Sequence, residues 1–249
     1  MRSATILSAL MAALLGLVPA QSTDVPVTGI LGNASIVENN PPGIIYTATF
    51  PTTQFFNPND PRGNVKGSVS AVANSNGIGV AFSVDFSNFP TSGGPFVYHL
   101  HAFPVSADGN CTNTQAHLDP YERGETPTCD SKLPQTCQVG DLSGKHGKIN
   151  TTEVGDHYTA NYVDNYPSTF PGIGSFFGNR SLVIHFANKT RITCANFTMA
   201  GKSVGGTGQN ATYTASPTTS APAQFTGDGT RNAVSMLTLL TITGLAFFW

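Results

Sequence analysis

Charged residues are scarce in this sequence. Of its 249 residues, 12 are Lys or Arg and 14 are Asp or Glu, so the formal net charge is −2. A protein that binds nucleic acid needs a basic surface to contact the phosphate backbone. The near-zero charge therefore argues against a nucleic acid as partner.

Two further absences narrow the fold class. The sequence has no Cys-x-x-Cys pair, so its spacing gives no support to a cysteine-ligated metal. The central part of the chain has no convincing amphipathic helix, because Gly, Pro and Asn interrupt it at short intervals and apolar and polar residues alternate between them. Both absences favour a β protein without a zinc-finger-like site.

The first 20 residues have the pattern of a secretory signal peptide. One basic residue, Arg2, precedes an apolar stretch over residues 6–18, and the small-residue sequence Val18-Pro19-Ala20 follows. This pattern predicts cleavage before Gln21 and an extracellular protein.

The last residues have the pattern of a GPI-anchor signal. Residues 233–249 are apolar, carry no charge and are few for a spanning helix. Small residues precede them, with Gly227 and Ser220 as candidate attachment sites. A tail anchor or a plain terminal helix is the alternative. Residues 203–231 are rich in Ser, Thr, Gly and Pro, which predicts an unfolded stalk.

Potential glycosylation sites are frequent. Seven Asn-x-Ser/Thr sequons fit a secreted surface protein. They begin at Asn33, Asn110, Asn150, Asn179, Asn188, Asn196 and Asn210. A surface covered by glycans disfavours a large shared interface, so we expect a monomer.

Residues 25–200 are the expected folded domain, an all-β fold. Apolar residues alternate with polar ones along residues 79–86, and Asn76-Gly77 before them is a signal for a type I′ hairpin turn. Further strands are expected at residues 44–50, 68–73, 96–101, 158–163 and 181–186. Short strands separated by turns predict an antiparallel β-sandwich or flattened barrel.

Four cysteines in a secreted domain predict two disulfides. Three pairings are possible in principle. Cys129 and Cys137 lie eight residues apart in one loop, and a local bridge there leaves Cys111 with Cys194. The second bridge would tie the loop after residue 101 to a strand near the end of the domain.

Histidines give the strongest chemical signal. His99 and His101 lie two apart at the end of a strand-like run, so both point to one face and can converge on an ion. His117 follows in a loop, and His185 lies on the strand at 181–186. Imidazoles without thiolates suit copper, zinc or nickel, and tetragonal nitrogen sites favour copper. A surface His-x-His pair that binds nothing is the alternative.

Residues 67–197 resemble the copper-containing superoxide dismutases, because five short motifs occur in the order found in that family. They are Tyr98-His99-Leu100-His101, Asn110-Cys111 through His117, Gly140-Asp141-Leu142, Ser181-Leu182-Val183-Ile184-His185 and Arg191-Ile192-Thr193-Cys194. The resemblance implies a Greek-key sandwich and four copper ligands, His99, His101, His117 and His185. It further implies an arginine, Arg191, that guides superoxide, with Lys189 adding positive charge.

Two departures from the copper-zinc enzymes are informative. The interval 118–140 contains no histidine, whereas those enzymes have two zinc histidines there; Gln138 stands at one of the places. Only five residues separate His185 from Arg191, where those enzymes insert a long charged loop. With the signal peptide and the tail, these losses are similar to the copper-only enzymes of fungal cell surfaces, which typically carry glutamate in place of Gln138.

The resemblance implies an extracellular enzyme that uses copper, without zinc, to convert superoxide to oxygen and hydrogen peroxide. We expect Asp141 to orient His117, directly or through Gln138, as neighbouring carboxylates do for metal-bound histidines. His146 and His157 are expected to pack or face solvent. Two alternatives remain: a copper-binding surface protein for storage or sequestration, and a GPI-anchored wall protein that uses the sandwich as scaffold.

Overall fold

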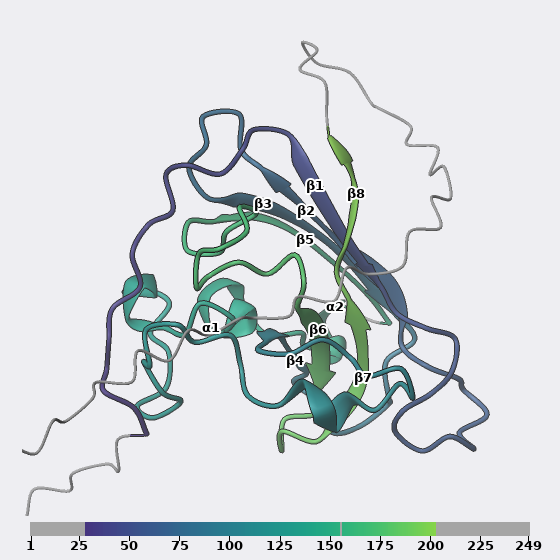
Figure 1. The fold of residues 1–249 in the computed structure, drawn as a ribbon. Coiled ribbons are helices and arrows are strands. Elements are labelled where there is room, and N and C mark those ends of the chain that lie inside the picture. Colours follow the sequence, from purple (N-terminus) through teal and green to yellow (C-terminus); the bar gives the residue numbers. More distant parts are fainter. Residues whose placement is uncertain (1–27, 155, 203–249) are drawn as a thin grey trace, which may run out of the picture. The chain divides into compact units, whose positions relative to one another are not determined.

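The computed structural model describes residues 28–154 and 156–202 (Figure 1). The strands are β1 Ile44–Thr49, β2 Lys66–Ala73, β3 Val80–Ser87, β4 Val97–His101, β5 His157–Asp164, β6 Ser181–His185, β7 Arg191–Asn196 and β8 Thr198–Lys202. The helical segments are the 3₁₀ turns Cys111–Thr114 and Pro134–Thr136 and the short helices α1 Leu142–His146 and α2 Thr151–Val154.

The strands form two antiparallel sheets. One has the order β5-β3-β2-β1-β8, and the other has the order β4-β6-β7. The chain passes from one sheet to the other after β3, β4, β5 and β7, which the sequence colours of the ribbon allow the reader to follow in Figure 1. The all-β sandwich expected from the sequence is confirmed, and so are all six expected strands, within two residues at each end.

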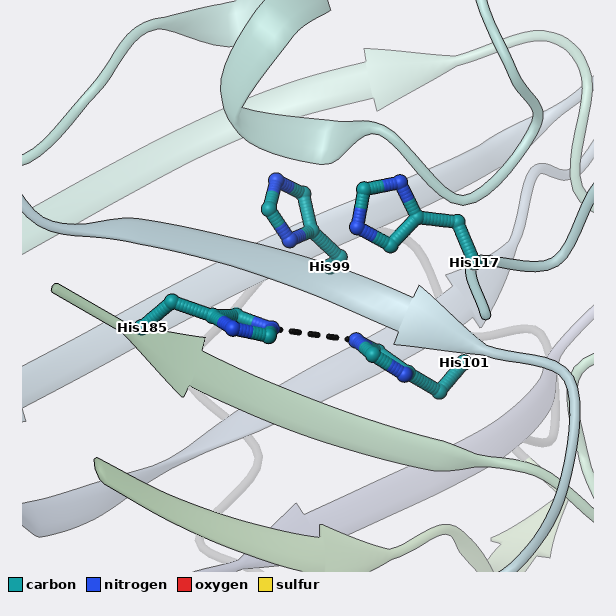
Figure 2. A group of neighbouring side chains, drawn as sticks. All are labelled: His99, His101, His117 and His185. Carbon is teal, nitrogen blue, oxygen red and sulfur yellow. Dashed lines mark hydrogen bonds between the residues drawn. The ribbon is translucent and has the colours of Figure 1, made fainter. Parts of the chain in front are cut away.

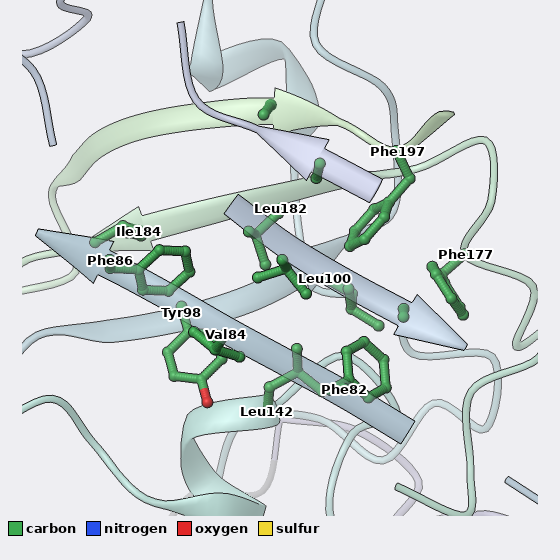
Figure 3. Close-up of a cluster of buried hydrophobic side chains, with 14 of the residues drawn as sticks. Phe82, Val84, Phe86, Tyr98, Leu100, Leu142, Phe177, Leu182, Ile184 and Phe197 are labelled. Atoms are coloured by element: carbon green, nitrogen blue, oxygen red, sulfur yellow. The ribbon is translucent and has the colours of Figure 1, made fainter. Parts of the chain in front are cut away.

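The hydrophobic core lies between the inner faces of the two sheets. Val84 and Phe86 of β3 face Tyr98 and Leu100 of β4 within one continuous cluster, which Figure 3 draws. Alternate residues of β3 are buried because successive side chains of a strand point to opposite faces. The same alternation in β4 sends Leu100 into the core and leaves its neighbours His99 and His101 on the other face.

Two local expectations are corrected. The hairpin between β2 and β3 exists, but residues 74–79 form a longer loop than a two-residue type I′ turn, in which Gly77 and Gly79 have positive φ while Asn76 does not. Segment 37–40 imposes this shape, since its backbone binds Gly77 and Gly79. The domain also contains α1 and α2, each too short to produce an amphipathic pattern.

Both disulfides of the preferred pairing are present. Cys111 is bonded to Cys194, and Cys129 is bonded to Cys137. The first bridge joins the 3₁₀ turn after β4 to β7. The second closes a local loop directly before Gln138. The two bridges therefore hold the segments that flank the candidate site.

Several predictions concern surface asparagines or the chain ends. Asn33, Asn179, Asn188 and Asn196 are exposed, and Asn110 and Asn150 are partly exposed; their glycosylation stays a prediction. The signal peptide, the stalk, Asn210 and the two anchor-site candidates lie outside the described residues. Within residues 28–154 and 156–202, no helix has the length and apolar character needed to cross a membrane.

Candidate metal centre

Four histidine side chains converge at one place on the three-stranded sheet (Figure 2). His99, His101, His117 and His185 each offer one ring nitrogen, and these four atoms all lie within 4.8 Å of one another. Three of the four residues are buried, and His117 is partly exposed. Among the residues that the structure describes, this is the one such group of potential metal ligands.

The strands place three of these side chains. His99 and His101 share a face of β4, and His185 ends β6, which pairs with β4 so that His185 lies opposite Val97. His117 comes from a loop that runs beside β4, where an isolated antiparallel bridge pairs it with His101. Residues far apart in the sequence thus meet because two strands and one loop lie edge to edge.

A backbone ladder holds that loop against β4. The N–H of Leu100 donates to Gly140, that of Leu118 donates to Leu100, and that of Gly140 donates to Leu118, all at 2.8–2.9 Å. A Cβ at position 140 would lie 2.2 Å from the carbonyl oxygen of Leu100. Glycine is therefore required here because three backbone segments meet.

Hydrogen bonds fix which nitrogen faces the cluster in three of the rings. The Nδ1 of His101 lies 2.7 Å from the carbonyl oxygen of Gln115, and that of His185 lies 2.9 Å from the carbonyl oxygen of Lys189. The Nδ1 of His117 lies 2.6 Å from Oε1 of Gln138. Because carbonyl oxygens only accept, each Nδ1 carries the proton and each Nε2 is left as a lone-pair donor.

His99 is turned the other way. Its Nε2 lies 3.4 Å from Oδ1 of Asp141, while its Nδ1 is buried without a hydrogen-bond partner in the described structure. A buried polar atom without a partner is destabilising unless a bound group satisfies it. The cluster therefore presents three Nε2 atoms and one Nδ1, and the orphaned Nδ1 fits a site built for a metal ion.

Burial keeps the rings of His101, His117 and His185 neutral. It lowers the pKa of His101 to about 2 and that of His185 to about 3, helped in both by the other imidazoles of the cluster. Burial and the neighbouring His99 lower the pKa of His117 to about 4. Burial raises the pKa of Asp141, but the interaction of its carboxylate with His99 outweighs burial and brings that pKa to about 2. At neutral pH these three histidines are unprotonated, as metal ligands must be.

The expected partner of His117 is corrected. The sequence led us to expect Asp141 to orient His117, whereas the structure places Gln138 directly on His117 and Asp141 on His99. Asp141 caps α1 by accepting from the N–H of Gly144, which turns its carboxylate toward β4. Asp119, which the sequence did not single out, accepts from Nε2 of Gln138 at 2.9 Å.

The cluster opens into a cavity of about 750 Å³. Arg191 and Lys189 lie on its wall with the histidines. The Nη2 of Arg191 donates to the carbonyl oxygen of Gln115 at 2.6 Å, the same oxygen that binds His101. Lys189 forms an ion pair at 2.6 Å with Glu125. Arg191 is thereby held beside the imidazoles, where its charge also lowers the pKa of His185.

The two remaining histidines of the described structure lie elsewhere. His146 contacts Asp164 at 2.9 Å and stacks on Tyr162, with ring centroids 3.9 Å apart. His157 is exposed and contacts Asp85 at 3.0 Å. Neither belongs to the four-histidine cluster.

An antiparallel β-sandwich with four converging imidazoles defines a class of metalloprotein, and the similarity to known proteins is specific. No protein-family model matches the sequence. A cell surface Cu-only superoxide dismutase of Arthroderma benhamiae is 42% identical over 204 residues, covering 72% of this chain and 52% of that protein. Cell surface Cu-only superoxide dismutase 5 of Candida albicans is 39% identical over 138 residues, covering 55% of this chain and 57% of that protein.

Solved structures agree with these relatives. The Cu(II) structure of Candida albicans superoxide dismutase 5 superposes with a TM-score of 0.53 and 33% identity, covering 68% of this chain and 99% of that chain. A single-residue mutant of the same enzyme gives a TM-score of 0.54 and 34% identity over all of its chain. The chain therefore belongs to the family of cell-surface Cu-only superoxide dismutases. It spans about half the length of the curated relatives it matches.

Proposed function

We propose that this protein is an extracellular superoxide dismutase that works at a single copper ion without zinc. The observation that carries the proposal is the convergence of four imidazole nitrogens, one of them an orphaned Nδ1. His99, His101, His117 and His185 would hold the ion. An all-imidazole donor set with no thiolate or carboxylate favours copper among the divalent transition metals.

Bound copper would supply the one-electron chemistry that takes an electron from one superoxide and gives it to the next. The protein's own residues hold three of the four rings in fixed tautomers, so that little reorganisation accompanies binding. Arg191 presents a guanidinium beside the cluster, where it attracts and orients a small anion. Its bond to the Gln115 carbonyl oxygen keeps the charge in place.

Among residues 28–154 and 156–202, no second group of potential ligands is present that would hold zinc. The interval 118–140 has no histidine, and Gln138 offers a neutral amide that is already bonded to His117 and Asp119. Asp141, at the position of a zinc ligand in the copper-zinc enzymes, contacts His99 instead. We therefore infer that hydrogen-bonding residues do here what zinc does in those enzymes, which is to orient the copper ligands.

We further propose that the mature protein is a glycosylated monomer, tethered to the cell surface by a GPI anchor at Gly227 or Ser220. The relatives are named cell surface proteins, and the chain ends carry the matching signals. Release of the protein from intact cells by a phosphatidylinositol-specific phospholipase supports the anchor. Retention after that treatment, with an apolar tail still attached, contradicts it.

The function is tested by loading the full chain with copper alone, counting bound metals and measuring superoxide consumption. We expect one copper per chain and a rate far above that of the metal-free protein. Added zinc should bring neither a second bound metal nor a faster rate. Copper binding without superoxide consumption would instead identify a copper-storage or sequestration protein. If no copper is bound, the remaining alternative is a GPI-anchored wall protein that uses the sandwich as scaffold.

A further inference from the structure

The carboxylate of Asp119, in the loop after His117, is a fixed acceptor. Its Oδ1 accepts from the backbone N–H of Arg123 at 2.9 Å, and its Oδ2 accepts from the backbone N–H of Gly124 at 2.8 Å. The Nε2 of Gln138 lies 2.9 Å from the same Oδ2. The two backbone bonds hold the carboxylate in one orientation, so that Oδ2 always faces Gln138.

The orientation of the Gln138 amide follows from that contact. An ionised carboxylate only accepts hydrogen bonds, so it stabilises the orientation in which the NH₂ group of Gln138 faces Asp119. The carbonyl Oε1 then faces Nδ1 of His117 at 2.6 Å. Since Oε1 only accepts, the proton of the His117 ring stays on Nδ1 and Nε2 keeps its lone pair.

We propose that Asp119 is a positioning residue: it fixes the orientation of the Gln138 amide and thereby holds His117 in the tautomer that binds copper through Nε2. The inference rests on the copper site proposed above. With the amide reversed, the NH₂ group would face Nδ1 of His117, which would then accept. The ring proton would move to Nε2 and compete with the metal.

A glutamate at position 138 would not depend on Asp119 in this way. Both of its carboxylate oxygens accept, so rotation of the group always presents an acceptor to His117. The side chain of Gln138 is buried, with 8% exposure, and follows directly after the bridged Cys137. The backbone is thus held by the disulfide, while the choice between the two amide orientations is left to Asp119.

The test is a double-mutant cycle in the full chain. Asp119→Ala is made in the native background and in the Gln138→Glu background. Long-range ¹H–¹⁵N NMR of the metal-free protein identifies the protonated ring nitrogen of His117. Competition with a chelator measures Cu(II) affinity. In the native background we expect a mixture of tautomers and a loss of roughly tenfold in affinity, which is typical when a partner of a metal ligand is removed. In the Gln138→Glu background, the proton should stay on Nδ1 of His117 after Asp119→Ala, and the Cu(II) affinity should not fall.

Asp130→Ala is the matched control, because Asp130 lies in the same loop and its carboxylate accepts only from the backbone of Lys132 among the described contacts. It should change neither readout. An equal loss in both backgrounds would mean that Asp119 merely supports the loop, and would overturn the inference. Full retention of the Nδ1 proton in Asp119→Ala would overturn it too. If the native chain binds no copper, the proposed function fails, while the NMR comparison still decides the role of Asp119.

Discussion

The molecule contains two buried clusters that pair a histidine with an aspartate, and helix α1 connects them. At its start Asp141 contacts His99 of the metal centre, and at its end His146 contacts Asp164. In the second cluster Lys145 lies 2.6 Å from Asp164, and its Nζ also donates to the carbonyl oxygen of Val139.

The two clusters differ in whether their polar side-chain atoms have hydrogen-bond or ionic partners within the protein. Asp164 has three donor partners, namely Lys145, His146 and the backbone N–H of Tyr166, and the ring of His146 is stacked on Tyr162. In the metal centre, by contrast, Nδ1 of His99 has no partner, and the Nε2 atoms of His101 and His185 face each other at 3.0 Å. Lone pairs that converge without donors indicate a site for a cation, whereas a completed network indicates a structural role.

The largest expected difference between the clusters is in copper binding. His185→Ala removes one of the four converging nitrogens, so we expect stoichiometric Cu(II) binding to be lost. His146→Ala leaves the donor set intact, and one copper per chain should remain. Metal counting after dialysis measures both variants. Equal copper loss in the two variants would contradict the distinction drawn between the clusters.

The next largest effect is expected on the stability of the metal-free chain, which the metal-centre histidines should lower in acid. The folded pKa values of His101, His117 and His185 lie near 2, 4 and 3, below the value of 6.5 for an exposed histidine. As the pH falls below about 6.5, the unfolded chain therefore takes up protons that the folded chain does not, and the free energy of unfolding falls. Denaturant unfolding of the metal-free chain between pH 7 and 4.5 measures this loss.

The second cluster should lose its contribution to the free energy of unfolding in a different pH range. Burial raises the pKa of Asp164, but Lys145 and His146 outweigh it and hold the pKa below its usual value. Its contribution is present above the unfolded value of 3.8 and is lost as the pH falls through the lower folded value. For the metal centre, a free energy of unfolding that stayed constant from pH 7 to 4.5 would contradict the neutral state of His101, His117 and His185 in the folded chain.

Asp164→Asn tests the structural cluster. The substitution leaves the ammonium of Lys145 buried without its counter-charge. Breaking a buried ion pair from one side lowers the free energy of unfolding by roughly 3 kcal/mol. Urea denaturation of the metal-free variant measures the change, while its copper stoichiometry should remain one. A variant with native stability but no copper would reverse the roles of the clusters.

The smallest effect is expected at the cavity wall. Arg191→Ala removes a guanidinium beside the cluster without removing a ligand, so copper binding should persist. Superoxide consumption should fall by about tenfold, as is usual when a steering charge is lost, and should depend less on ionic strength. Pulse radiolysis at low and high salt measures both. Loss of copper in this variant would show that Arg191 supports the site rather than the substrate.

The sequence predicts the parts of this protein that follow a period or a motif. Alternation identifies the strands and sets His99 and His101 on one face, and the family resemblance adds His117, His185 and Arg191. The partners of His99 and His117 follow no period, because they come from the irregular loop 118–141. Asp141 was expected to orient His117, directly or through Gln138, but the cap of α1 turns it toward His99, and Gln138 contacts His117 instead. The sequence gives no signal for Asp119, because its proposed role depends on the orientation of the Gln138 amide.

The central claim is that four imidazoles of this chain form one copper site. Electron paramagnetic resonance of the full chain, loaded with Cu(II) and compared with its His185→Ala variant, tests it most directly. The account requires one copper per chain with hyperfine splitting from nitrogen ligands, and loss of that signal in the variant. A spectrum dominated by oxygen or sulfur ligands, or an unchanged signal in His185→Ala, would contradict it.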